Sequence, residues 1–327
     1  MAGSTESAVG AVADGLFDKY LLPKVALAVI LGASLVGTAL TGRLVGQAAP
    51  WFVLAKWGYF VALGVLAGGL LWTHAFVRPG DLETDAAAYC AAMYDRFDRL
   101  SLGALLVFVP AGVVVLLGYR DVLRGGPLVG ALALSLAVLA VTTLAERGRR
   151  PVEARFRSRL GVVGLGAALL AVTLTALAEV ALQGGGPVAG GVRVLHLLAF
   201  SAWLGGAVWN IFVAVPSGQA RPTTPVVLAA GEQLERFRWT VRVVIPTLVL
   251  TGLVQAVGAL GTDPSTYLGT VVGLAVLAKL GLVGVLVAIF LVCPMWRACS
   301  PIDGVCDLAD LDRGPAITAE AAGGADD

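Results

Sequence analysis

The chain is poor in charge and in side chains that bind metals or form disulfides. Charged residues make up 14% of the 327 positions, with two histidines, four cysteines and three methionines. A soluble globular domain averages about 25% charged residues, so this composition excludes an ordinary soluble protein. The net charge of +1 provides no basic surface, and we expect no nucleic-acid partner. Four unevenly spaced cysteines are too few for a disulfide framework.

Apolar residues dominate instead, at 58% of the chain with a mean hydropathy of +0.86. Apolar runs of about 20 residues recur, each long enough to cross roughly 30 Å of hydrocarbon. They predict an all-α, polytopic membrane protein with the lipid bilayer as its main partner. The eight predicted spanning helices cover residues 24–46, 53–77, 99–119, 126–146, 160–183, 191–216, 240–260 and 268–293.

The arginines predict how these helices are oriented. The segment 146–159 holds six arginines, and the opposite loops hold only Arg43, Arg120 and Arg124. Because positive loops stay inside, both termini are predicted to be cytoplasmic in a multi-pass protein of the cell membrane. Residues 1–22 lack the pattern of a secretory signal peptide and are predicted to form a cytoplasmic or interfacial segment.

The sequence also repeats itself. DRFDRL (95–100) matches ERFRWT (235–240) at an offset of 140, and Gly68-Gly69 matches Gly205-Gly206 at an offset of 137. Four helices in each half predict two parallel repeats, 23–150 and 158–295, followed by a cytoplasmic tail at 296–327. In such proteins a site between the repeats is the first place to expect binding.

The strongest candidate site lies on RVLHLLAFSAWLGGAVWN, residues 193–210. His196 and Trp203 are seven residues apart and share one face of a helix. Gly205 and Gly206 allow another helix to approach closely. Tyr59 stands at the position of His196 in the first repeat, so we expect the chemistry to be concentrated in the second.

Two charged residues fall inside predicted helices of the second repeat. Lys279 lies near the middle of the eighth helix, where a charge costs roughly 2.5–3.5 kcal/mol. It either snorkels or pairs as a structural lysine, or it lines a polar path and binds an anionic group. Glu179 lies at a depth similar to His196 and could orient its ring or share a metal with it. Alternatively, Glu179 faces water at the interface.

Other polar residues are weaker candidates. Asn210 and Gln255 are expected to form hydrogen bonds between helices. His74 is predicted to lie about 22 Å below His196, at 1.5 Å per residue, so the two cannot share one haem or metal within a protomer. A single haem held by one histidine and a different axial ligand remains possible. No catalytic arrangement is present, and no enzymatic activity is predicted.

Soft ligands gather after the last predicted helix. Cys293, Met295, Cys299 and Cys306 offer thiolates and a thioether, which select Cu(I). Their spacing matches no zinc signature, and the alternative is a loop with incidental thiols.

Four pieces of the second repeat resemble the copper resistance D (CopD) family of membrane proteins. They are HLLAFSAWLGG (196–206), Arg236-Phe237, LTGLVQA (250–256) and STYLGTVVGLAVLAKLGLV (265–283), within residues 190–295. The resemblance implies an eight-helix inner-membrane protein of copper uptake or homeostasis. The residues that match the family pattern are His196, Trp203, Gly205, Gly206, Thr251, Gly252, Tyr267 and Lys279.

The functional hypothesis that follows is copper transport. Copper would pass between the repeats, by His196 and Glu179, to the Cys/Met group, with a copper-carrying protein or other membrane subunits as partners. One alternative is a membrane subunit of a redox complex associated with haem b or a quinone. The other is a non-catalytic protein that assembles with other membrane proteins.

Overall fold

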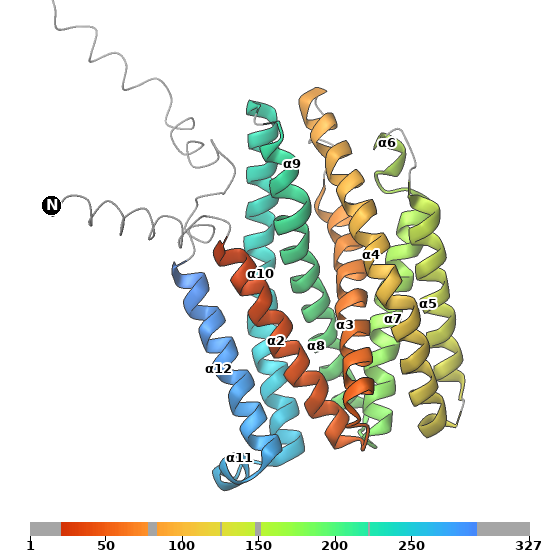
Figure 1. The fold of residues 1–327 in the computed structure, drawn as a ribbon, viewed down its shortest axis with the longest axis vertical. Coiled ribbons are helices and arrows are strands. Elements are labelled where there is room, and N and C mark those ends of the chain that lie inside the picture. The colour runs from red at the N-terminus through yellow and green to blue at the C-terminus, as the bar shows by residue number, and fades with distance from the viewer. Residues whose placement is uncertain (1–20, 78–83, 125, 148–151, 222, 293–327) are drawn as a thin grey trace, which may run out of the picture.

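The computed structural model describes residues 21–77, 84–124, 126–147, 152–221 and 223–292. Every element in these ranges is helical, and eight of the helices are long and apolar enough to cross a membrane (Figure 1). This confirms the predicted all-helical fold class and the prediction of eight helices with the length and composition of membrane spans. The long helices are α2 (Leu21–Leu44), α3 (Pro50–Leu71), α4 (Thr84–Leu123), α5 (Pro127–Glu146), α7 (Arg159–Leu182), α8 (Pro187–Val208), α10 (Thr224–Leu260) and α12 (Val271–Val292).

Short elements extend or connect the long helices. They are η1 (Trp72–Phe76) after α3, α6 (Val152–Arg155), η3 (Trp209–Ala214) and α9 (Val215–Gln219) after α8, and α11 (Pro264–Gly269) before α12. Proline begins α3, α5 and α8, where its missing N–H has no intrahelical partner to lose. The N-cap of α7 is Ser158, whose hydroxyl accepts a hydrogen bond from the N–H of Gly161 at 2.9 Å.

Helices α4 and α10 begin about 15 residues before the predicted starts at 99 and 240. Charged residues such as Asp95 and Glu235 separate their first turns from the apolar runs from which the spans were predicted. Ion pairs between successive turns stabilise the helix in this charged region. Arg236 of α10, for example, pairs with Glu232 one turn earlier at 2.6 Å. In α4 and α10 the helix is therefore longer than the apolar run that predicted the membrane span.

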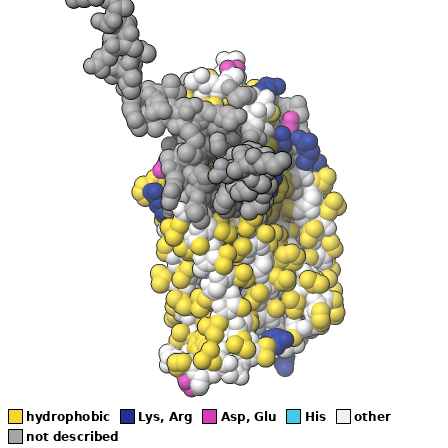
Figure 2. All heavy atoms as spheres, turned by 60° about the vertical axis from the view of Figure 1, so that its left-hand side comes forward, with side chains coloured by type: hydrophobic (Ala, Val, Ile, Leu, Met, Phe, Trp, Pro, Cys, Tyr) yellow, Lys and Arg dark blue, Asp and Glu magenta, His cyan; other side chains and the backbone are white. Residues whose placement is uncertain are grey.

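Helices α3 and α8 lie at the centre of the bundle and are the most enclosed of the eight. They pack on each other, and α4 and α10 pack on α3 and α8 respectively. Helices α5 and α7 pair on one side and α2 and α12 on the other (Figure 1). Figure 2 shows an apolar belt on the visible face, with charged side chains gathered toward its ends.

The crossing of α3 and α8 is built on two glycines. A Cβ atom added to Gly205 would lie 2.3 Å from the Cα of Gly68, so the two backbones are in contact there. Without a hydrophobic force between helices in lipid, such close backbone packing is a main source of association. The central pair of helices is held at this point.

Candidate functional site

A buried carboxylate joins three helices inside the bundle. Glu179 of α7 is 1% exposed and forms an ion pair with Lys56 of α3, whose Nζ lies 2.5 Å from Oε1. Its other oxygen, Oε2, accepts hydrogen bonds from Nε (2.8 Å) and Nη2 of Arg193 on α8. One negative charge therefore serves two cations in a region of low dielectric.

The turn between α7 and α8 explains why Glu179 meets Arg193. Gly184 adopts φ of +68° just after α7, a conformation that favours glycine. The N–H of Gly185 then bonds back to the carbonyl of Val180 at 2.9 Å. The chain reverses within residues 183–186, so the last turns of α7 face the first turns of α8.

The polar contacts continue from Arg193 to His196. Arg193 donates through Nη1 to Oε1 of Gln255 on α10 at 2.9 Å, and Gln255 donates to the carbonyl of Thr251 at 3.0 Å. The hydroxyl of Thr251 lies 2.8 Å from Nδ1 of His196. Polar contacts thus lead from Lys56 through Glu179, Arg193 and Gln255 to the backbone of Thr251, whose side chain contacts the imidazole.

The hydrogen bonds of Thr251 favour one tautomer of His196. Thr251 has one hydroxyl proton, which is directed to the backbone carbonyl of Thr247 at 2.5 Å. Its oxygen must therefore accept the hydrogen bond from His196, which places the ring proton on Nδ1. In this tautomer Nε2 carries the lone pair of the ring, and the ring also lies within hydrogen-bond reach of the backbone carbonyl of Leu248.

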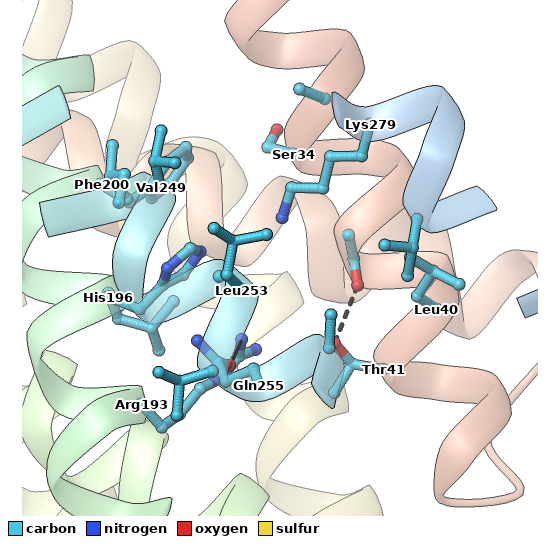
Figure 3. A pocket seen from close by; sticks show the side chains of 18 of the residues that line it. Ser34, Leu40, Thr41, Arg193, His196, Phe200, Val249, Leu253, Gln255 and Lys279 are labelled. Atoms are coloured by element: carbon cyan, nitrogen blue, oxygen red, sulfur yellow. Dashed lines mark hydrogen bonds between the residues drawn. The ribbon is translucent and has the colours of Figure 1, made fainter. Parts of the chain in front are cut away.

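His196 lines a partly open cavity of about 540 Å³ between α2, α8, α10 and α12. This volume falls within the roughly 300–1,000 Å³ of small-molecule sites. Most of the wall is apolar, including Phe200 and Trp203 on the same helix as His196. Arg193, Gln255 and the hydroxyls of α2 add polar groups on the other sides (Figure 3).

Lys279 enters this cavity from α12. Figure 3 shows its side chain extending from α12 beside α2, on the side where Leu253 and His196 lie. Space for it comes from Gly37 of α2, where a Cβ atom would stand 3.0 Å from Nζ. Among the described residues, Lys279 has no hydrogen-bond or ion-pair partner. A half-buried ammonium without a counter-ion therefore faces an apolar space inside the bundle.

The site as a whole carries a positive charge. Glu179 compensates only one of the three cations Lys56, Arg193 and Lys279. Two positive charges remain, and in a water-poor interior they attract an anion and repel a cation more strongly than at the protein surface.

The structure places the predicted site residues in different settings. His196, Trp203, Gly252 and Lys279 line the cavity, and Thr251 positions His196. Gly205 contacts Gly68, whereas Gly206 packs against Trp72 and Phe237. Tyr267 lies in α11 and donates to the carbonyl of Gly261 at 2.9 Å. Cys293, Met295, Cys299 and Cys306 lie outside the described residues, as do residues 1–20 of the predicted segment 1–22 and the predicted tail 296–327.

Glu179 and His196 do not contact each other as the sequence suggested they could. The closest basic group on α8 is Arg193, one turn before His196, and its guanidinium takes the carboxylate that the imidazole would need. Within the described chain, no group of three or more His, Cys, Asp or Glu side chains is close enough to hold a metal ion. The metal roles of both residues stay predictions.

His74 occupies a separate part of the bundle, in η1. Its ring packs against Gly161 in the first turn of α7, where a Cβ atom would lie 2.3 Å from Nε2 of His74. Glu179, which is connected to His196 by the polar contacts described above, is near the last turn of the same helix. The two histidines are thus separated by most of the length of α7.

Sequence reasoning missed Lys56 and Arg193 as members of the site. Both stand near helix starts, where a charge is ordinary. The available signal was their spacing, because they are 137 residues apart, the same offset that relates Gly68 to Gly205. The predicted repeat would place the two cations at equivalent positions of the two central helices.

Fold and site together define a multi-pass helical membrane protein with a cationic internal cavity. No family model, no curated protein and no solved structure matches the chain. The resemblance to the copper resistance D family and the identity of the host membrane stay predictions.

Proposed function

We propose that this protein binds an amphiphilic anion, taken up from the bilayer, in the cavity between α2, α8, α10 and α12. The observation that carries the proposal is Lys279, an ammonium with no counter-ion among the described residues, directed into an apolar space. Charged groups inside a membrane are costly and mark substrate or ion pathways by default. An anionic headgroup would neutralise Lys279, and an apolar body would cover the walls.

Access from the lipid supports this proposal. Helices α10 and α12, which form one side of the cavity, are the least enclosed of the spanning helices. Their outer faces carry exposed apolar side chains such as Leu250 and Val271. A ligand with a hydrocarbon body can approach these helices without leaving the bilayer.

We infer that the predicted parallel repeat is present, and several contacts support it. Gly68 touches its own equivalent, Gly205, as expected at a two-fold axis. The ring of Trp72 lies 5.6 Å from Phe237, and Trp209 lies 5.4 Å from Phe97, which are reciprocal pairs. In this arrangement Tyr59 takes the place of His196, and its hydroxyl is bound to Thr175 at 2.7 Å.

Binding of oleate to the purified protein in neutral nanodiscs tests the proposal. We expect saturable oleate binding, weakened about tenfold or more by Lys279→Gln, because a hydrogen bond to a charged group contributes about 1.5–3 kcal/mol. Lys24→Gln removes a lysine charge from the first turns of α2 and should leave the affinity unchanged. Oleyl alcohol, which lacks the carboxylate, should bind equally to all three proteins.

Equal oleate affinity of the wild-type and Lys279→Gln proteins would refute the proposal. The stability of the same variant gives an independent check on folding. Because the substitution removes an uncompensated charge, the free energy of unfolding should stay the same or rise while binding is lost.

Copper passage is the second candidate function, and the imidazole of His196 on the cavity wall favours it because imidazole is a good copper ligand. The uncompensated positive charges oppose entry of a free copper cation. Copper accumulation in cells and metal analysis of the purified protein test this function. His196→Ala should abolish a copper effect that His74→Ala leaves intact. Unchanged accumulation together with no bound copper would exclude it.

A further inference from the structure

We propose that the amphiphilic anion is haem, held in the cavity with Nε2 of His196 as an axial ligand of its iron. This inference rests on the proposed function and names its ligand class. Haem is planar and apolar and carries two carboxylates at one edge. The cavity offers each complementary feature: an imidazole lone pair, a free ammonium and apolar walls.

The imidazole is prepared for ligation before any ligand binds. Histidines that bind a metal usually donate the other ring N–H to an oxygen, which orients the ring and raises the basicity of the ligating nitrogen. Thr251 provides that oxygen at 2.8 Å from Nδ1. When Nε2 binds the iron, the axial chloride or water of free haemin leaves, and no electron is transferred.

A single protein ligand is sufficient for haem, in contrast to a bare metal ion. The porphyrin supplies four nitrogens, so no cluster of protein ligands is required. This agrees with the described residues, where no group of three or more potential metal ligands occurs. Among the residues that the structure describes, no second histidine, methionine or cysteine lines the cavity, and we expect a five-coordinate, high-spin iron.

The rest of the wall suits the porphyrin ring and its carboxylates. Phe200 and Trp203 follow His196 by four and seven residues, so all three side chains share one face of α8 and line the cavity. Aromatic side chains bury large flat areas against such a ring. Lys279 supplies the cation for a propionate, and this carboxylate would relieve its unpaired charge.

Titration of the purified protein with haemin in neutral nanodiscs tests the inference. We expect one equivalent to bind with a red-shifted Soret band of the high-spin type. His196→Ala should abolish the shift, and added imidazole should restore it by occupying the vacated axial position. His74→Ala removes the only other histidine and should behave as the wild type. Lys279→Gln should weaken haemin binding about tenfold while leaving the ligated spectrum unchanged.

Restoration by imidazole shows that the His196→Ala protein is folded, so loss of the band reports ligation. An identical Soret shift in the wild-type and His196→Ala proteins would overturn the inference, since haemin would then bind elsewhere. If oleate binds in a manner dependent on Lys279 but haemin causes no shift, haem is excluded and the proposed function stands. If neither ligand binds, both are refuted.

Discussion

Glu179 is the shared counter-ion of Lys56 and Arg193, and its carboxylate is buried at the junction of α3, α7 and α8. A buried ion pair gives little net stability compared with an apolar replacement, because desolvation opposes the attraction. Loss of one partner is different, because the remaining charges stay buried without compensation. At this site a single substitution would leave two cations unpaired.

We therefore expect Glu179→Gln to lower the free energy of unfolding by about 3–5 kcal/mol. Chemical unfolding in detergent, followed by tryptophan fluorescence, measures the change. Glu235→Gln is the matched control, because Glu235 is 48% exposed and pairs with Arg238 at 2.9 Å on the same helix. An exposed pair contributes about 1 kcal/mol or less. Similar losses in both variants would contradict a structural role of the buried network.

Thr251 is a positioning residue, since it acts on a ligand only through His196. We expect nitrogen NMR of the ligand-free protein to show His196 protonated at Nδ1. The sequence contains only one other histidine, which makes the assignment simple. Thr251→Val removes the acceptor and should shift the tautomer toward Nε2, whereas Thr251→Ser should retain the wild-type signal. An Nε2-protonated ring in the wild type would disprove the inferred tautomer.

At the scale of elements, the crossing of α3 and α8 depends on the absence of side chains. We expect Gly205→Ala to cost about 1–3 kcal/mol of unfolding free energy, the usual range for an overpacked site. The added Cβ would meet backbone atoms of Gly68, which cannot rotate away. Gly166 of α7 has no heavy atom within 4 Å of an added Cβ. Gly166→Ala should be neutral or stabilise the helix by up to about 1 kcal/mol.

The spanning helices could be predicted from the sequence because each needs an apolar run of fixed length, and all eight runs are present. The starts of α4 and α10 could not, because charged residues separate their first turns from the apolar runs. His196 and Lys279 were identifiable as polar residues in apolar runs. The cavity that these two residues share could not be predicted from the sequence. One of its walls is α2, from the first half of the chain, and no local sequence pattern indicates that α2 packs there.

At the scale of the whole molecule, the two sides of the bundle differ. Helix α5 lies against α7, α12 lies against α2, and the cavity lies beside α2 and α12. On the side of α7, Tyr59 stacks on Phe108, with ring centroids 5.7 Å apart, and its hydroxyl is hydrogen-bonded to Thr175. On the side of α2 and α12, His196 and Lys279 line the cavity. The residues on the two sides therefore differ in kind and in charge.

The orientation of the bundle decides from which side this cavity is reached. Helices α2 and α12 have their first and last described residues at one end, and α11 lies at the other (Figure 1). The arginine-rich loops predict that α11 is outside. Thr223 and Thr262 are exposed and flank the two ends of α10, so they report on opposite faces of the membrane.

We expect Thr262→Cys to react with a membrane-impermeant maleimide on intact cells, and Thr223→Cys to react only after permeabilisation. Both are introduced into a protein whose four native cysteines are replaced by serine. The reverse labelling pattern would contradict the cytoplasmic placement of the termini. In the predicted orientation His196 and the Glu179 network lie in the outer half of the bundle, because Glu179 is near the end of α7 that leads into the 183–186 turn. A ligand entering from the outer leaflet would then reach His196 without crossing the contact between Gly68 and Gly205.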